Sequence, residues 1–205
     1  MRENNMEKIY NYINGSKVAL SKNELPVDDP STGEEIARVV LSSTADFDLA
    51  IETSKKSQIE WANTTPLKRS RILSNYKKLI EENIEYLASI VSKEHGKTLA
   101  DAKGSVTRGL EVVEFACGIP HLLKGDFSLN VGTNIDSWSI RQPLGVCAGI
   151  TPFNFPAMVP MWMYPIAIAC GNSFILKPSE KDPSCSLKLA ELFSEAGLPD
   201  GVFNV

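Results

Sequence analysis

Residues 142–176 contain no Asp, Glu, Lys or Arg, and this uncharged stretch of 35 residues most constrains how the chain can fold. Proline or glycine interrupts it at eight positions: 143, 145, 149, 152, 156, 160, 165 and 171. A membrane-spanning helix needs about 20 consecutive apolar residues, and each run between these positions is much shorter. Strands buried on both faces of a parallel sheet also read as continuous apolar runs. The stretch therefore predicts the buried core of an α/β protein.

The order of elements after Pro143 predicts a parallel sheet. Buried strands are expected at 144–150, 173–177 and 202–205, with an apolar helix over 156–170 and a second helix that Asp182-Pro183 opens and Gly197 ends. This β-α-β-α-β order implies right-handed crossovers, and it is typical of one half of a doubly wound, mononucleotide-binding fold. Three parallel strands alone leave an edge and a face uncovered. We therefore expect the sequence to be a truncated piece.

The residues before this half-sheet predict strands followed by helices. Short strands and turns are expected over 9–41, where Asn14-Gly15 is a hairpin signal and 29–33 a turn cluster. Three helices are expected next: one over 45–62 capped by Thr44, one that opens at Thr65-Pro66 and runs to Gly96, and one over 98–118. Two strands follow, at 126–133 and 136–142. These boundaries divide the chain into a helical part (1–125), a β-ribbon (126–142) and an incomplete half-sheet (143–205).

Composition narrows the class of protein. The chain has 205 residues, of which 43% are hydrophobic, and a formal net charge of −4, so neither a disordered chain nor a basic nucleic-acid binder is expected. The four cysteines form no C-x-x-C pair and no metal-ligand spacing, which is typical of free thiols in a reducing compartment. Since the N-terminus lacks the apolar core of a signal peptide, we expect a cytoplasmic protein with no membrane or metal partner.

Two loops at the carboxyl ends of predicted strands contain the residues that could perform chemistry. In the first loop, Asn154 is a lone amide in apolar surroundings that could stabilise an oxyanion, although local chemistry favours a cap on the helix that starts near Pro156. In the second, Lys177 and Glu180 could bind a sugar hydroxyl, and the carboxylate would favour NAD over NADP. The alternative for this pair is a solvated surface ion pair.

Together, these loops resemble the aldehyde dehydrogenase superfamily, which has an aromatic-Asn-Phe-Pro loop followed some twenty residues later by Lys-Pro-Ser-Glu. The match continues through Gln142-Pro143-Leu144-Gly145-Val146, the segment 196–205 and the turn 29–33, and covers nearly the whole chain from about Tyr12. Phe153 stands where the superfamily commonly has tryptophan. The longer run TPFNFPAMVPMWM and the segment 108–114 look like the CoA-acylating methylmalonate-semialdehyde dehydrogenase branch.

The resemblance implies a fold, two cofactors and a role for each site residue. The fold would be the first half of a doubly wound NAD-binding domain, preceded by helices and an oligomerisation ribbon, with NAD as cofactor and coenzyme A as co-substrate. Asn154 would be the oxyanion donor, Thr151 and Phe153 would line the nicotinamide side, and Lys177 and Glu180 would contact the adenosine ribose. Lys181 would lie nearby, at a position where the family often has arginine. Arg108 would bind the carboxylate of the semialdehyde, although its helical position equally fits a solvated arginine.

Other interpretations of the same residues remain open. A hydrolytic aldehyde dehydrogenase would release a free acid, and a chain that naturally ends at Val205 could be a non-catalytic assembly module. The family's nucleophilic cysteine lies beyond Val205, so we expect the 205 residues alone to have no dehydrogenase turnover. The resemblance also implies a homo-oligomer, a dimer or a tetramer, formed through the ribbon.

Overall fold

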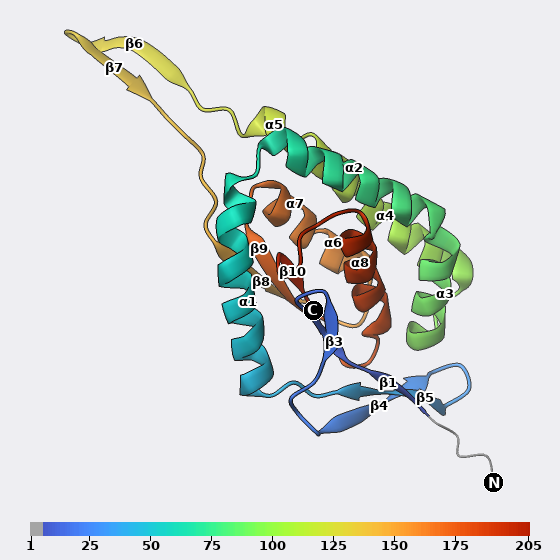
Figure 1. Ribbon diagram of the computed structural model, residues 1–205. Helices are drawn as coiled ribbons and strands as arrows, with labels where there is room; N and C mark the ends of the chain where they lie inside the picture. Colours follow the sequence, from blue (N-terminus) through green and yellow to red (C-terminus); the bar gives the residue numbers. More distant parts are fainter. Residues whose placement is uncertain (1–5) are drawn as a thin grey trace.

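Three parallel strands form the central sheet in the computed structural model, which describes residues 6–205 (Figure 1). They are β8 (Val146–Ile150), β9 (Ser173–Lys177) and β10 (Phe203–Asn204), arranged in the order β10-β9-β8. Both pairings are parallel. The predicted half of a doubly wound sheet is therefore confirmed. Because the strands are parallel, their carboxyl ends all lie at the same edge of the sheet.

The central strand β9 is covered on both faces. Ile175 packs with Ala50 of α1 (Thr44–Asn63) on one face, while Phe174 and Leu176 belong to the main core on the other. This alternation follows from the two-residue period of a strand. Burial on both faces explains why residues 173–176 read as an uninterrupted apolar run.

Proline positions divide the segment between β8 and β9. Residues 156–170 were expected to form one helix, and that prediction is wrong. They form two short helices, α6 (Met158–Met161) and α7 (Tyr164–Ala169). Pro165 has no N–H to donate, and in a continuous helix its ring would clash with the carbonyl of Met161, which is where α6 ends.

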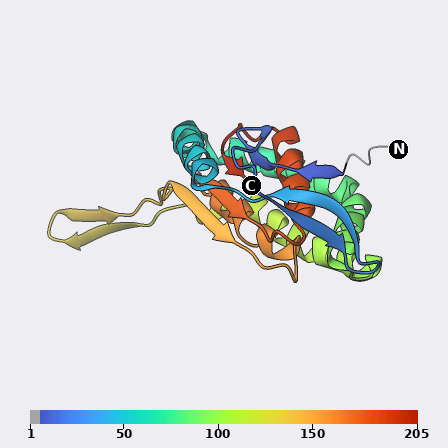
Figure 2. The same ribbon diagram turned by 90° about the horizontal axis from the view of Figure 1, so that it is seen from below.

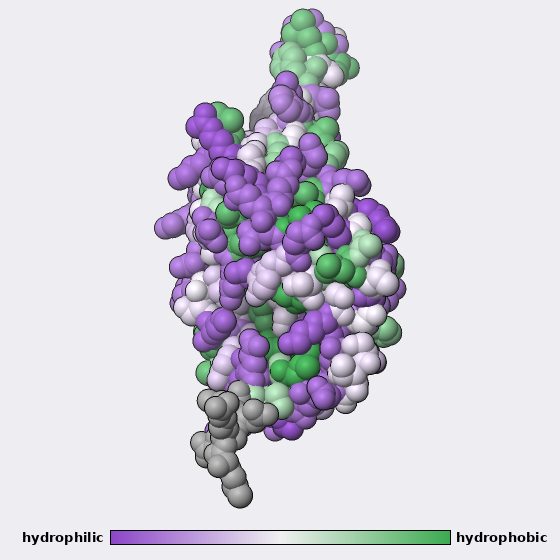
Figure 3. All heavy atoms as spheres, turned by 90° about the vertical axis from the view of Figure 1, so that its right-hand side faces the viewer, coloured by the Kyte–Doolittle hydropathy of each residue, from purple (hydrophilic) through white to green (hydrophobic). Residues whose placement is uncertain are grey.

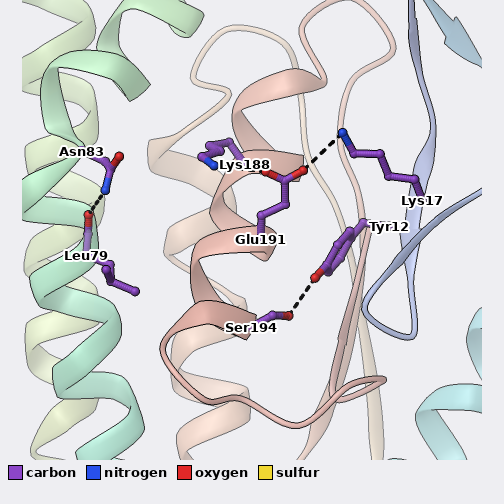
Figure 4. Close-up of polar contacts among 7 residues, drawn as sticks. All are labelled: Tyr12, Lys17, Leu79, Asn83, Lys188, Glu191 and Ser194. Carbon is purple, nitrogen blue, oxygen red and sulfur yellow. Dashed lines mark hydrogen bonds and ion pairs between the residues drawn. The ribbon is translucent and has the colours of Figure 1, made fainter.

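The helices before the sheet begin at capping residues, but the second predicted helix is broken. Thr65 caps α2 (Pro66–Glu82) by accepting a hydrogen bond from the backbone N–H of Lys68. The predicted continuation to Gly96 is wrong, because the chain leaves the helix at Asn83 and a separate helix, α3 (Ile84–His95), follows. The Asn83 side chain donates to the carbonyl of Leu79 at 2.8 Å (Figure 4), and this local bond competes with the regular helix.

Two caps also differ from expectation. The first helix is capped by Ser43 rather than Thr44, since Ser43 and Asp46 form a reciprocal capping box. At the start of α8 (Ser184–Glu195) the predicted cap, Asp182, makes no capping bond. The carboxylate of Glu94, at the end of α3, accepts the N–H of Ser184 at 3.0 Å instead.

Aromatic side chains join the helices to the sheet. Tyr76 of α2 stacks on Phe193 of α8 with ring centroids 4.0 Å apart, and Tyr164 stacks on Phe203 of β10 at 4.3 Å. The hydroxyls of Tyr76 and Tyr164 hydrogen bond to each other at 2.6 Å in full burial. The helix α4 (Leu99–Cys117), which follows α3, contributes Val106 and Val113 to the same core.

The N-terminal strands form a second, mixed sheet and a hairpin. The sheet contains β1 (Glu7–Ile9), β4 (Glu24–Asp29) and β5 (Glu34–Val40) in the order β1-β5-β4, and β2 (Asn11–Ile13) pairs with β3 (Ser16–Val18). The predicted Asn14-Gly15 turn is confirmed, with φ of 55° and 73°, as a primed hairpin turn requires.

The hairpin is attached at two places to the half-sheet segment, residues 143–205. The backbone of Tyr12 exchanges hydrogen bonds with Val205, the residue after β10. On α8, Ser194 accepts from the Tyr12 hydroxyl and Glu191 pairs with Lys17 (Figure 4). A single hydrophobic core cluster contains Tyr12 together with side chains of the helices and of β9. The division of the chain into parts at 125 and 142 stays a prediction.

A β-ribbon projects from the body beyond α5 (Ile119–Leu122), as Figures 1 and 2 show. Its strands, β6 (Phe127–Gly132) and β7 (Ile135–Trp138), are shorter than predicted. The helical face seen in Figure 3 is mostly hydrophilic, whereas hydrophobic side chains gather on the ribbon at the top of the picture. The exposed apolar ribbon residues are Phe127, Leu129, Val131, Ile135 and Trp138.

The first sheet strand is less buried than its composition predicts. Val146 and Ile150 on β8 are exposed, Ile150 by 78%, and β8 is an edge strand of the sheet. Within the described range, no helix has the length and apolarity to cross a membrane. The same residues hold no cluster of three or more His, Cys, Asp or Glu suited to a metal ion.

Candidate functional site

The two predicted loops meet at the carboxyl edge of the sheet. Ile150, the last residue of β8, is paired with Lys177, the last residue of β9. One residue further, the backbone N–H of Thr151 donates to the carbonyl of Lys177 at 3.1 Å. The loop after β8 and the loop after β9 are therefore fixed to each other at their bases.

Lys177 and Glu180 form an ion pair at this edge. Their Nζ and Oε2 atoms lie 2.8 Å apart, and the hydrogen bond from Lys177 lowers the pKa of Glu180. The side chains are 60% and 44% exposed, as a solvated pair would be. They also line a pocket of about 470 Å³, whose opposite wall is the connection between β5 and α1, residues 39–44 and Phe47. Small-molecule pockets commonly fall in the range of about 300–1,000 Å³.

Phe153 and Lys181 connect the tips of the same two loops. The Lys181 ammonium lies 4.7 Å from the centroid of the Phe153 ring, within the range of a cation–π contact. Both side chains are exposed. The five residues predicted to bind a cofactor thus belong to two adjoining loops, although only Lys177 and Glu180 line the pocket.

Asn154 does not cap a helix. The next helix, α6, has Ala157 at its N-cap and no side-chain cap, so the capping alternative is wrong. Asn154 is exposed. Its carboxamide has no hydrogen-bond partner among residues 6–205, but its backbone carbonyl accepts a bond from Lys97 at 3.3 Å.

Thr151 presents a buried hydroxyl at the base of the first loop. The residue is 4% exposed, and its Oγ1 atom has no hydrogen-bond partner in the described part of the chain. A buried hydroxyl without a partner costs free energy, and a bound ligand with a donor or acceptor at this point would remove that cost. The residues of this edge therefore fit a polar ligand that lies across both loops.

Arg108 lies away from the two loops. It is exposed on α4, next to Gly109, whose close approach to Met161 brings α4 against α6. Among the described residues, no hydrogen bond or ion pair joins Arg108 to the loop residues. Both predicted roles, a carboxylate partner and a solvated arginine, remain compatible with this position.

The four cysteines have the properties of packing residues. Burial raises the pKa of Cys117, Cys147, Cys170 and Cys185. A raised pKa reduces the thiolate fraction, and the thiolate is the nucleophile. Each of these thiols is therefore a poor nucleophile in this environment.

Sequence reasoning missed a group of three polar residues near the two loops: Lys97, Glu94 and Asp182. Lys97 follows the helix stop at Gly96, so by pattern it is an ordinary loop lysine. Glu94 is buried, and burial raises its pKa to about 7. The pKa of Asp182 is also raised to about 7, first by burial and then by the Glu94 charge. The three residues come together only through the tertiary fold, and no spacing in the sequence could have indicated them.

Comparisons with known proteins show a family. The profile of the aldehyde dehydrogenase family matches residues 18–205. The chain is 54% identical to a malonate-semialdehyde dehydrogenase of Pseudomonas aeruginosa, over 98% of this chain and 40% of that protein. It is 49% identical to an acylating, mitochondrial methylmalonate-semialdehyde dehydrogenase of Arabidopsis thaliana, over 97% of this chain and 33% of that protein. The chain therefore spans only about 40% or less of the length of these curated relatives.

Solved structures show the same fold. A structure from Sinorhizobium meliloti 1021, described as a methylmalonate-semialdehyde dehydrogenase complexed with NAD, superposes with a TM-score of 0.96 at 51% identity. A methylmalonate-semialdehyde dehydrogenase from Oceanimonas doudoroffii gives the same two values. In each case the match covers 98% of this chain and 41% of the solved chain.

Proposed function

The chain belongs to the aldehyde dehydrogenase family, and from this membership we propose that it is part of an NAD-dependent, CoA-acylating methylmalonate- or malonate-semialdehyde dehydrogenase. The observation that carries the proposal is that the Asn154 loop and the Lys177–Glu180 pair adjoin at one sheet edge. The names of the relatives at 54% and 49% identity support the choice of substrate.

The proposed NAD site uses residues of both loops. Lys177 and Glu180 would bind the adenosine ribose, because a lysine donates and a carboxylate accepts hydrogen bonds from hydroxyls. Thr151 offers a buried hydroxyl without a partner among residues 6–205, and Phe153 an exposed aromatic face. Lys181, whose ammonium lies over the Phe153 ring, would hold that ring in place beside the cofactor. When bound, NAD supplies the hydride acceptor of the reaction.

In the proposed reaction a cysteine thiolate attacks the aldehyde carbon, and Asn154 donates its side-chain N–H to the resulting oxyanion. Loss of a hydride from that carbon leaves a thioester on the enzyme. The thiol of coenzyme A then replaces the cysteine and forms an acyl-CoA, and the semialdehyde's carboxylate leaves as CO₂ while the carbon that carried it takes up a proton. The nucleophilic cysteine would lie beyond Val205, since the raised pKa values of the four thiols described above leave them poorly ionised.

Arg108 is proposed as the partner of the substrate carboxylate. Its exposed position on α4 leaves the guanidinium free, and a planar guanidinium pairs with a carboxylate through two parallel bonds. The projecting ribbon, with its exposed apolar side chains, would join subunits into a dimer or tetramer, since exposed apolar patches mark interaction sites. A cytoplasmic location stays a prediction.

Assays of the full-length gene product test the proposal. With malonate semialdehyde and NAD, we expect NADH formation that requires coenzyme A for repeated turnover and yields an acyl-CoA. NADH formation at an unchanged rate without coenzyme A, with a free acid as product, would identify the hydrolytic alternative. No NADH under either condition would contradict the dehydrogenase assignment. The isolated residues 1–205 serve as the control, for which no turnover is expected.

A further inference from the structure

Lys97 is a nearly buried lysine whose ammonium lies against the loop that contains Asn154. Its side chain is only 7% exposed, which is unusual because a lysine is rarely buried unless it is paired. It lies between α3 and α4, and its partners include the carbonyl oxygen of Asn154 at 3.3 Å.

Two further contacts fix the direction of this ammonium. Nζ lies 4.4 Å from the centroid of the Phe155 ring and 3.6 Å from the carboxylate of Asp101, which is 54% exposed. The lysine therefore contacts both residues of the Asn154-Phe155 pair, one through its backbone carbonyl and the other through its ring. Asp101 lies on the outer side and partly neutralises the charge.

The backbone of Lys97 is itself firmly held. Its carbonyl accepts a hydrogen bond from the Ser92 hydroxyl at 2.8 Å. Gly96, just before it, has φ of 81°, and a Cβ there would lie 2.7 Å from Cγ of Pro30. The lysine thus extends from a fixed point toward the loop.

The imidazole of His95 also lies against this loop, at the backbone of Asn154. Asn154 and Phe155 belong to no helix or strand, and the Asn154 side chain has no hydrogen-bond partner among residues 6–205. Burial and the neighbouring Lys97 charge lower the pKa of His95, so at neutral pH this histidine is uncharged and the cation beside the Asn154 peptide is Lys97.

We propose that Lys97 is a positioning residue, which holds the Asn154 peptide by its carbonyl and so aims the Asn154 carboxamide at the reacting oxygen. The inference rests on the proposed function, because it assumes that Asn154 is the oxyanion donor. Lys97 itself touches neither the substrate nor the cofactor in this arrangement. An oxyanion donor must be held in place before the charge develops, and a displacement of 1 Å can cost a factor of about 100 in rate.

The test is a double-mutant cycle in the full-length gene product. Lys97→Met should lower kcat by about 10- to 100-fold, with little change in KM for NAD, because the ribose contacts lie on the other loop. In an Asn154→Ala background the same substitution should cost less than about 2-fold, since coupled residues are not additive. Lys97→Gln, which keeps a donor, should recover part of the kcat.

A purely structural role would give a different pattern. It would lower kcat by the same factor in both backgrounds, and that result would overturn the proposal, as would a loss below about 2-fold in the wild-type background. If Lys97→Met does not fold, the cycle is carried out with Lys97→Ala, which also lacks a donor, and the same outcomes decide. The matched control is Lys103→Met on α4, an exposed lysine paired with Glu85, which should leave kcat unchanged.

The same assays distinguish a failure of the proposed function from a failure of the positioning role. In that case the wild-type protein would form no NADH from the semialdehyde, and Asn154→Ala would have nothing to lower. An active wild type with a large Asn154→Ala effect and additive Lys97 variants would reject only the positioning role.

Discussion

The backbone N–H of Thr151 donates a hydrogen bond of 3.1 Å to the carbonyl of Lys177. This bond joins the ends of two neighbouring strands, so the loop with Asn154 and the loop with Glu180 start from one fixed point. In the proposed site, the contacts to the adenosine ribose and the oxyanion donor thereby lie on two different loops that share a common base. Substitutions of Asn154 and of Glu180 should therefore affect different kinetic constants.

Asn154→Ala should lower kcat of the full-length gene product by about 10²–10³-fold, the usual cost of removing one oxyanion donor. KM for NAD should change little, because Asn154 does not line the pocket beside Lys177. Steady-state kinetics with the semialdehyde measure both constants. Asn75→Ala, at an exposed asparagine on α2, is the matched control. A loss of less than about 5-fold in kcat would remove Asn154 from the mechanism.

Glu180→Gln should raise KM for NAD by about 10-fold or more, since hydrogen bonds to charged groups contribute about 1.5–3 kcal/mol. The same change should increase the use of NADP relative to NAD, because the carboxylate that repels a 2′-phosphate is gone. Unfolding free energy should change by less than about 1 kcal/mol, as for an exposed ion pair. Glu52→Gln breaks the equivalent exposed pair with Lys55 on α1 and should alter neither cofactor constant. An unchanged ratio of NADP to NAD use would contradict the ribose contact.

The parts of the fold that local sequence determines were predictable. The Thr65-Pro66 helix start, the Asn14-Gly15 turn and the strand 173–177 depend on residues within one turn or one strand, and all three are confirmed. Buried apolar residues keep a helical spacing across the break at Asn83, so periodicity could not reveal it: Ile72, Tyr76, Ile80, Leu87 and Val91. The break depends on a side-chain bond to Leu79, which competes with helical hydrogen bonding.

The candidate site was predictable only in part, for a similar reason. Lys177 ends a strand, Glu180 and Asn154 lie in the loops that follow strands, and strand order placed all three at one edge. Lys97 comes to Asn154 from 57 residues away, and the pocket wall comes from residues 39–47. Such contacts depend on how helices and sheet pack, and no short-range pattern encodes them.

Tyr76→Phe or Tyr164→Phe should each lower the unfolding free energy by about 1–3 kcal/mol, because the remaining hydroxyl is left buried without its partner. The two hydroxyls lie 2.6 Å apart and both residues are fully buried. The double variant should lose less than the sum of the single ones, since no polar group then remains unpaired. Chemical denaturation measures all three. Additive losses would show that the hydroxyl pair is not the relevant interaction.

Glu94→Gln should change how stability depends on pH. Burial raises the pKa of Glu94 from 4.5 to about 7, so between these values the folded protein keeps a proton that the unfolded chain releases. The unfolding free energy must then fall as pH rises through this window. Ser184 and Lys93 favour the charged form of Glu94, and Glu7 and Asp182 oppose it.

The glutamine variant keeps an oxygen to accept the Ser184 N–H but carries no titrating charge. Wild type and variant should have similar stability near pH 5, whereas near pH 8 the variant should be more stable by about 1–3 kcal/mol. Denaturation curves at both pH values measure the difference. Glu85→Gln, at an exposed position on the same helix, should leave the pH dependence unchanged. A variant that loses stability between pH 5 and 8 as steeply as the wild type would show that another group, with Asp182 the first candidate, causes the loss.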